Sequence, residues 1–76
     1  MRAAVALRYD PSFDDAPQVV SVGRCELARE MERVARRYGV PIVEDCSLTA
    51  RLIQVPVPEP IPCELYSEVA LIFIQI

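Results

Sequence analysis

The sequence predicts an α/β fold, a small three-stranded mixed sheet with one βαβ unit, packed with three helices in the order β-β-α-β-α-α. Three observations predict it. The chain has 76 residues, 53% hydrophobic and 25% charged, which is the balance of a single small globular domain over residues 1–76. Short apolar or β-branched runs lie before and after one amphipathic helix. A strand, a helix and a strand in succession indicate parallel strands joined by a right-handed crossover.

The first two strands are expected on either side of a loop. Residues 3–9 form an apolar run without polar alternation, typical of a strand covered on both faces. Residues 10–17 contain two prolines and three aspartates, which indicates a loop. Residues 18–22 are short and β-branched, so they predict the second strand.

Residues 23–38 carry the clearest signal, that of an amphipathic helix ended by Gly39 at its C-cap. Its apolar side chains recur with helical spacing and are expected to face the core: Leu27, Met31, Val34, Ala35 and Tyr38. The opposite face mixes arginine and glutamate, which favours a solvated, ion-paired surface over a site for an acidic partner. Residues 40–44 are predicted as the third strand, parallel to residues 18–22.

Two more helices are expected in the second half of the chain. Asp45 or Ser47 caps a short helix over residues 48–54. Residues 56–62 have proline at every second position, which predicts an extended, rigid connector. Pro62 then starts a last helix, whose apolar positions are Leu65, Tyr66, Val69, Ala70, Ile72 and Phe73.

Several residue types are absent, and this narrows the function. The chain has no His, Asn, Lys or Trp, which excludes His-based triads, Schiff-base lysines and the P-loop lysine. The net charge of −3 disfavours a general nucleic-acid binder, because no basic excess offsets phosphates. The longest apolar run is far shorter than the roughly 20 residues that span a bilayer. We therefore expect a binding module and not an enzyme.

The cysteines and acidic groups suggest no metal or cofactor. Cys25, Cys46 and Cys63 are odd in number and contain no CxxC spacing, which indicates a reducing compartment without a disulfide framework or zinc site. Cys25 lies at a helix start beside an arginine, a setting that activates thiols. The alternative function is therefore a small cysteine-dependent, redox-responsive protein, although an ordinary helix-start residue explains Cys25 as well. Glu44 and Asp45 could form an acid–base pair, but helix capping is the favoured interpretation.

Five segments taken in order resemble the cytoplasmic domain of the FlhB/YscU family, the export-switch proteins of flagellar and virulence type III secretion. They are AVALRYD at residues 4–10, APQVVSVG at 16–23, VPIVE at 40–44, LTARL at 48–52 and IPCELYSEVA at 61–70. The resemblance covers residues 4–73. Its specificity comes from the order and spacing of the blocks, since no single block is diagnostic.

The chain departs from the family at the step of self-cleavage. In the family, a strand and an Asn-Pro-Thr-His turn precede the AVAL strand, and the asparagine cyclises to cut its own backbone. This chain contains neither Asn nor His. The resemblance therefore implies a stand-alone paralogue of the cytoplasmic domain, without the family's transmembrane helices and without autocleavage.

The resemblance also implies a docking patch for export substrates of rod and hook type. Carried over to this sequence, the patch consists of Ala16, Pro17, Ala70 and Phe73. From the residues alone, Phe73 could equally belong to the core. The implied function is a non-enzymatic component or accessory of the flagellar export apparatus, or of an injectisome. Its implied partners are export substrates and membrane-bound export-gate proteins, and its implied place is the cytoplasm beside the gate at the inner membrane. A sheet edge left open predicts a homodimer or a strand-donating partner.

Overall fold

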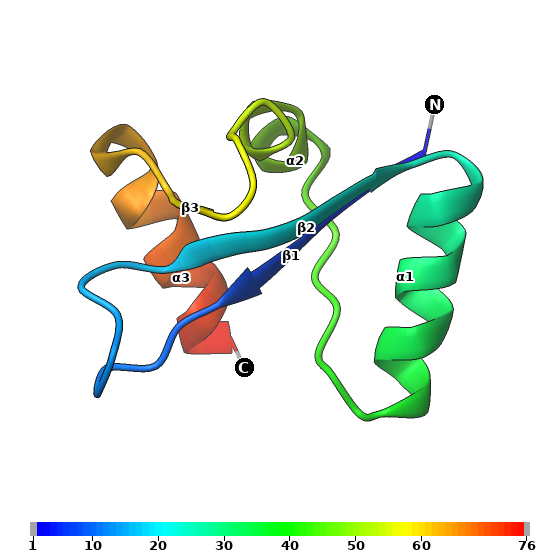
Figure 1. Ribbon diagram of the computed structural model, residues 1–76, viewed down its shortest axis with the longest axis horizontal. Coiled ribbons are helices and arrows are strands. Elements are labelled where there is room, and N and C mark those ends of the chain that lie inside the picture. Colours follow the sequence, from blue (N-terminus) through cyan, green and yellow to red (C-terminus); the bar gives the residue numbers. More distant parts are fainter. Residues whose placement is uncertain (1, 76) are drawn as a thin grey trace.

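The computed structural model describes residues 2–75, and the two end residues of the predicted domain lie outside them. The described residues form three strands, three helices and a short 3₁₀ turn, η1, that leads into the last helix. Figure 1 shows how the strands and helices are arranged. In chain order they are β1 (Ala3–Arg8), β2 (Gln18–Arg24), α1 (Glu26–Arg37), α2 (Cys46–Leu52), β3 (Glu59–Pro60), η1 (Cys63–Leu65) and α3 (Tyr66–Gln75). The predicted α/β class, with three strands and three helices, is confirmed.

The sheet has the order β1-β2-β3, and both pairings are antiparallel. β1 and β2 form a long ribbon in which Ala3 lies opposite Arg24 and Arg8 opposite Gln18. The register shifts between Ala6 and Leu7. An irregularity of this kind bends a strand and increases its twist.

The predicted βαβ unit is wrong. Residues 40–44 are extended but belong to no strand, and the third strand is β3, which runs antiparallel to β2. The sheet is therefore not mixed, and the element order is β-β-α-α-β-α. Within residues 2–75, no backbone hydrogen bond joins Ile42, Val43 or Glu44 to another segment. A β-branched sequence becomes a strand only where a neighbouring edge supplies that ladder.

The proline-rich segment, predicted to be an extended, rigid connector, also contributes a strand to the sheet. It contains a cis peptide bond between Val57 and Pro58, and its next two residues form β3. The Ile61 N–H donates to the Pro17 carbonyl at 2.9 Å, which fixes this segment beside β2. Pro60 is tolerated there because β3 is the edge strand, where a missing N–H costs least.

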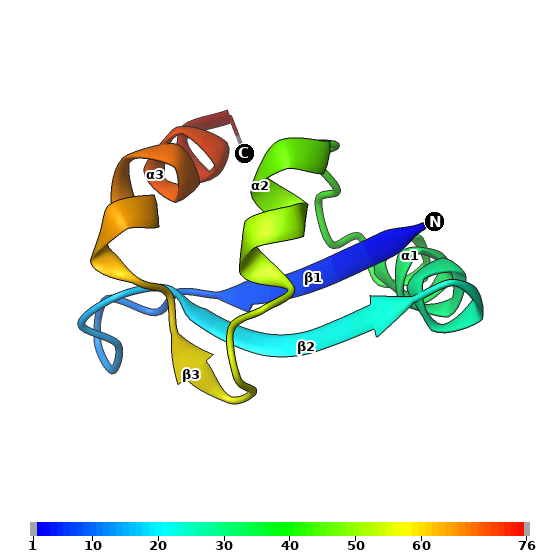
Figure 2. The ribbon, with the colours of Figure 1, turned by 90° about the horizontal axis from the view of Figure 1, so that it is seen from above.

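The hydrophobic core lies between the sheet, α2, α3 and the segment that joins them. Figure 2 shows α2 and α3 side by side over the sheet, with α1 at the other end of the molecule. The buried cluster consists of Val19, Leu48, Leu52, Val55, Ile61, Leu65 and Val69. Full burial of one such side chain stabilises the fold by roughly 1.5–3 kcal/mol. This end of the molecule therefore supplies most of the hydrophobic stabilisation.

Helix α1 is confirmed, but its predicted buried face is only partly correct. Ala28 is its one fully buried residue, whereas Leu27, Val34 and Tyr38 are 54%, 40% and 73% exposed. α1 packs on the end of a two-stranded ribbon, which is too narrow to cover the whole apolar stripe. A Cβ at Gly23 would lie only 2.6 Å from a Met31 side-chain atom, so the glycine permits the close approach of helix and strand.

The end of α1 and the start of α2 have the capping residues that the sequence predicts. Gly39 has a φ of 71°, the left-handed conformation of a glycine that ends a helix. Asp45 caps α2, because its carboxylate accepts a hydrogen bond from the Leu48 N–H at 3.0 Å. Asp45 is thus a capping residue, as expected, and α2 begins two residues earlier than the sequence predicted. No helix within residues 2–75 has the length and apolar character needed to cross a bilayer.

Candidate functional site

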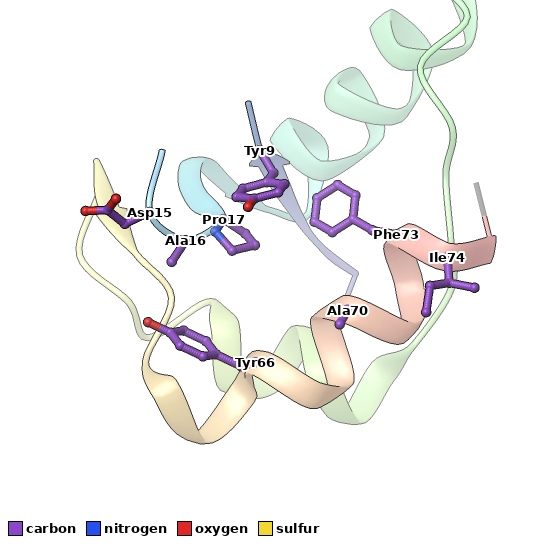
Figure 3. A pocket seen from close by; sticks show the side chains of 8 residues that line it. All are labelled: Tyr9, Asp15, Ala16, Pro17, Tyr66, Ala70, Phe73 and Ile74. Carbon is purple, nitrogen blue, oxygen red and sulfur yellow. The ribbon is translucent and has the colours of Figure 1, made fainter. Parts of the chain in front are cut away.

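An apolar groove of about 310 Å³ lies between α3 and the loop that joins β1 to β2. All four residues of the predicted docking patch line it, namely Ala16, Pro17, Ala70 and Phe73. Figure 3 shows them facing one another, with Tyr9, Asp15, Tyr66 and Ile74 completing the walls. The fold therefore places two pairs of residues, more than 50 positions apart in the sequence, around one groove.

Helix α3 supplies one wall through a single face. Tyr66, Ala70 and Ile74 are spaced four residues apart and therefore lie above one another. The neighbouring face carries Val69, which is fully buried and fixes the rotation of the helix. A bidentate ion pair from Arg51 to Glu68 also ties α3 to α2, with one N–H···O distance of 3.0 Å.

The loop between β1 and β2 supplies the other wall and is held by its own hydrogen bonds. The Phe13 and Asp14 N–H groups donate to the Asp10 carbonyl at 2.9 and 2.7 Å. The Asp14 carboxylate accepts from the Asp10 N–H at 2.9 Å and from Arg8 at 3.1 Å. These bonds, first that from the Asp10 backbone and then that from Arg8, lower the pKa of Asp14 below its ordinary value. The loop is thus preorganised as a wall.

Phe73 belongs to both the core and the groove. It is half-buried and packs against the hydrophobic cluster, while its ring lies 6.2 Å from the Tyr9 ring at an angle of 50°. This tilted arrangement is a favourable aromatic contact. Ala70 is exposed, and its small side chain leaves space in the groove. The two alternatives for Phe73, core or patch, are therefore not exclusive.

Four of the eight residues that line the groove were not predicted from the sequence. Tyr66 and Ile74 lie one helical turn before and after Ala70, so the four-residue spacing could have found them. Tyr9 and Asp15 carry no such signal. They lie on either side of the loop segment that the hydrogen bonds between Asp10 and Asp14 close.

The cysteines do not converge on a second site. Cys25, Cys46 and Cys63 are all exposed and unpaired as disulfides. Among the residues that the structure describes, no three His, Cys, Asp or Glu side chains could hold a metal ion. Cys25 has an unusual backbone, with φ 54° and ψ −119° at the N-cap of α1, and makes no capping hydrogen bond with its side chain. The unusual feature of Cys25 is thus its backbone conformation.

Comparison with known proteins places this chain in a family. The model of the FlhB HrpN YscU SpaS Family matches residues 1–76. The Bacillus subtilis (strain 168) protein named "Uncharacterized protein YlqH" is 41% identical over 73 residues, which is 96% of this chain and 78% of that protein. The flagellar biosynthetic protein FlhB of Aquifex aeolicus is 35% identical over 68 residues, 88% of this chain but 19% of the relative. The chain thus spans about a fifth of the FlhB proteins that it matches.

Solved structures share the fold. The PscU C-terminal domain superposes with a TM-score of 0.91 at 24% identity, covering 96% of this chain and 94% of that one. A mutated EscU/SpaS C-terminal domain gives 0.93 at 23% identity, covering 96% and 91%. The fold is therefore that of the PscU and EscU/SpaS C-terminal domains. The chain belongs to the FlhB HrpN YscU SpaS Family.

Proposed function

We propose that this chain is a non-enzymatic component or accessory of the flagellar type III export apparatus that binds export substrates in the groove. The observation that carries the proposal is the groove itself. Ala16 and Pro17 on one wall face Ala70 and Phe73 on the other, which is the patch expected from the family resemblance. The fold supplies this surface from residues that sequence order keeps far apart.

The size and chemistry of the groove favour a peptide side chain as its occupant. Its volume of about 310 Å³ is at the lower end of the roughly 300–1,000 Å³ typical of small-molecule sites. Its walls are mostly aromatic and aliphatic, with one carboxylate and two tyrosine hydroxyls. Such a surface suits one or two apolar side chains of a protein segment.

The proposal assigns no autocleavage to this chain. The sequence contains neither the asparagine nor the histidine of the family's cleavage turn. The proposed place is the cytoplasm, peripheral to the export gate at the inner membrane. The proposed partners are rod- and hook-type export substrates and membrane-bound export-gate proteins.

The outer edge of β1 is proposed as a second contact surface. β1 pairs with β2 on one side, and within residues 2–75 no backbone hydrogen bond reaches its other side. An unpaired edge accepts a strand from a second copy or from a partner. Light scattering over a range of concentrations tests the homodimer, and a constant monomer mass up to millimolar concentration would exclude it.

Substitutions on α3 test the groove. Isothermal titration calorimetry with purified rod and hook proteins from the same genome should show binding that Ala70→Asp abolishes, because the change places a charge in the groove. Leu71→Asp is the matched control, since Leu71 is 60% exposed on the same helix and does not line the groove. Equal binding by the two variants would contradict the proposal. The proposal would also be contradicted if the parent chain bound none of these proteins and deletion of its gene left motility normal.

A further inference from the structure

Charge is distributed unevenly between the two ends of this molecule. The end that carries the groove, residues 8–18 and 46–75, contains six carboxylates and two arginines. Both arginines are already bound, Arg8 to Asp14 at 3.1 Å and Arg51 to Glu68. The groove end is therefore strongly acidic, although the whole chain has a net charge of only −3.

Four carboxylates at this end have no cationic partner within residues 2–75: Asp10, Asp15, Glu59 and Glu64. Asp15 alone among them lines the groove, and its carboxylate accepts no hydrogen bond from any described residue. A carboxylate at the wall of an apolar hollow produces a negative potential that the low-dielectric wall focuses on the opening. The groove therefore attracts cations and repels acidic segments.

The groove has two chemically different ends. Figure 3 shows Asp15 at one end, toward which the Tyr66 hydroxyl points, and Phe73 and Ile74 at the other, with Ala70 between them. Tyr66 and Ile74 are eight positions apart on α3, which corresponds to about 12 Å along the helix. A segment lying in the groove would thus contact apolar rings and methyl groups at one end and a carboxylate at the other.

We propose that the docked segment combines an apolar anchor, seated against Ala70, Phe73 and Ile74, with a lysine or arginine that pairs with Asp15. The inference rests on the proposed function and defines which segments of an export substrate the groove selects. The anchor and the cation are expected to lie apart by roughly half to two thirds of the length of the groove. In an extended segment, this distance corresponds to about two or three residues, with the cation before or after the anchor. In a helical segment the separation is about four or five residues.

The pair at Asp15 sets specificity more than affinity. An exposed ion pair contributes little on its own, because water and salt screen it. Its effect is discrimination, since a glutamate in place of the cation meets the acidic end of the groove and is rejected. The apolar anchor supplies most of the binding energy, so the charge determines which of several apolar segments docks.

Peptide arrays and fluorescence anisotropy test the proposal. Overlapping peptides of about 15 residues, covering the rod- and hook-type proteins of the same genome, are probed with the labelled chain. Bound peptides should contain an apolar residue with a Lys or Arg at the stated spacing. In anisotropy titrations, Lys/Arg→Gln in the peptide and Asp15→Asn in the chain should each weaken binding about two- to fivefold at low salt, without adding to one another. Glu44→Gln removes the same charge away from the groove and should have no effect.

A charge exchange provides the decisive arm. Asp15→Lys should reject the Lys/Arg peptide and bind the same peptide with Glu in that position. If Ala70→Asp abolishes peptide binding but none of the charge changes affects it, this inference is overturned and the proposed function stands. Peptide binding that Ala70→Asp does not affect would overturn the proposed function, and this inference with it.

Discussion

The groove end and the α1 end of this small domain bury their apolar residues to different extents. At the groove end, α2 and α3 contribute several side chains to one buried cluster that includes Leu52 and Val69, although Leu71 stays exposed. At the other end, α1 buries Ala28 and leaves Leu27 and Val34 exposed, while an ion pair from Arg2 to Glu32 links it to the residue before β1. Stability is therefore concentrated where the groove is built.

The two ends also differ in the sign of the charges that lack an ion-pair partner. Asp15 lines the groove without a cationic partner, whereas the arginines without an ion-pair partner among residues 2–75 are Arg24 and Arg37, at either end of α1. The exposed apolar stripe of α1 lies beside a face that mixes arginine and glutamate, whereas Asp15 lines the apolar groove. The variants below separate the two ends.

The largest expected effect comes from a matched pair of leucines. Leu52→Ala should lower the free energy of unfolding by about 2–5 kcal/mol, because Leu52 is 3% exposed in the core. That is a large part of the roughly 4–11 kcal/mol expected for a domain of this size. Leu27→Ala should cost less than about 1 kcal/mol, since Leu27 is half exposed on α1. Urea denaturation measures both, and equal losses would contradict the division into two ends.

A methyl group at Gly23 should loosen the α1 end selectively. In Gly23→Ala the new Cβ would lie 2.6 Å from a Met31 side-chain atom and 2.8 Å from one of Leu27, so these side chains must shift. We expect a loss of about 1–2 kcal/mol, as for modest overpacking. Amide hydrogen exchange should show faster exchange in α1 and unchanged protection in α3. Uniform loss of protection would mean that the two ends unfold as one unit.

Acid should weaken both ends, through Asp14 at the groove end and through carboxylates that include Glu32 at the α1 end. The Asp10 N–H and Arg8 lower the pKa of Asp14 from its ordinary 3.8, and Arg2 lowers that of Glu32 from 4.5. A carboxylate with a depressed folded pKa contributes stability above its unfolded pKa and loses it as the pH falls through the folded value. Stability should therefore decline below about pH 4.5, and Asp14→Asn or Glu32→Gln should flatten that decline. Thermal denaturation between pH 2 and 7 measures it, and an unchanged profile in either variant would contradict the role of that residue.

Added salt should reduce the stability contributed by these two carboxylates to different extents. The Asp14 side chain is 7% exposed and accepts a backbone N–H as well as Arg8, whereas Glu32 is held mainly by the exposed arginines Arg2 and Arg36. Added sodium chloride should reduce the contribution of Glu32 more, because salt screens exposed ion pairs more than a hydrogen bond to the backbone. Comparison of each variant with the parent chain at low and high salt gives the two dependences.

Local sequence was sufficient where a local rule decides the structure. The apolar run of β1, the helical spacing of α1 and α3, the cap at Asp45 and the glycine after α1 all follow from neighbouring residues. The errors concern pairing. Val40–Glu44 has strand-forming residues but no ladder partner, while the Glu59–Pro60 pair has poor strand residues but lies beside β2. The groove combines local and non-local effects. The four-residue spacing on α3 predicts one wall, whereas the other wall depends on how the loop between β1 and β2 closes.

The smallest expected effect concerns Cys25, which joins β2 to α1. Its φ of 54° and ψ of −119° place a residue with a Cβ in a region that favours glycine. Cys25→Gly should therefore raise the stability by up to about 1 kcal/mol, since relief of strain exceeds the added entropy of the unfolded chain. Differential scanning calorimetry measures the shift, with Cys46→Gly as a control that should destabilise α2, because glycine is a poor helix former.

The same variant weighs the cysteine-dependent alternative. If Cys25 is only a residue in a strained turn, Cys25→Gly should leave substrate-peptide binding unchanged under oxidising and reducing conditions. Alkylation of the parent chain by iodoacetamide should then proceed at the same rate at Cys25, Cys46 and Cys63, since all three are exposed. Selective rapid alkylation of Cys25, together with redox-dependent binding that the glycine variant lacks, would instead make the α1 end a functional site in its own right. The contrast between a groove that binds and a helix that only completes the fold would then no longer hold.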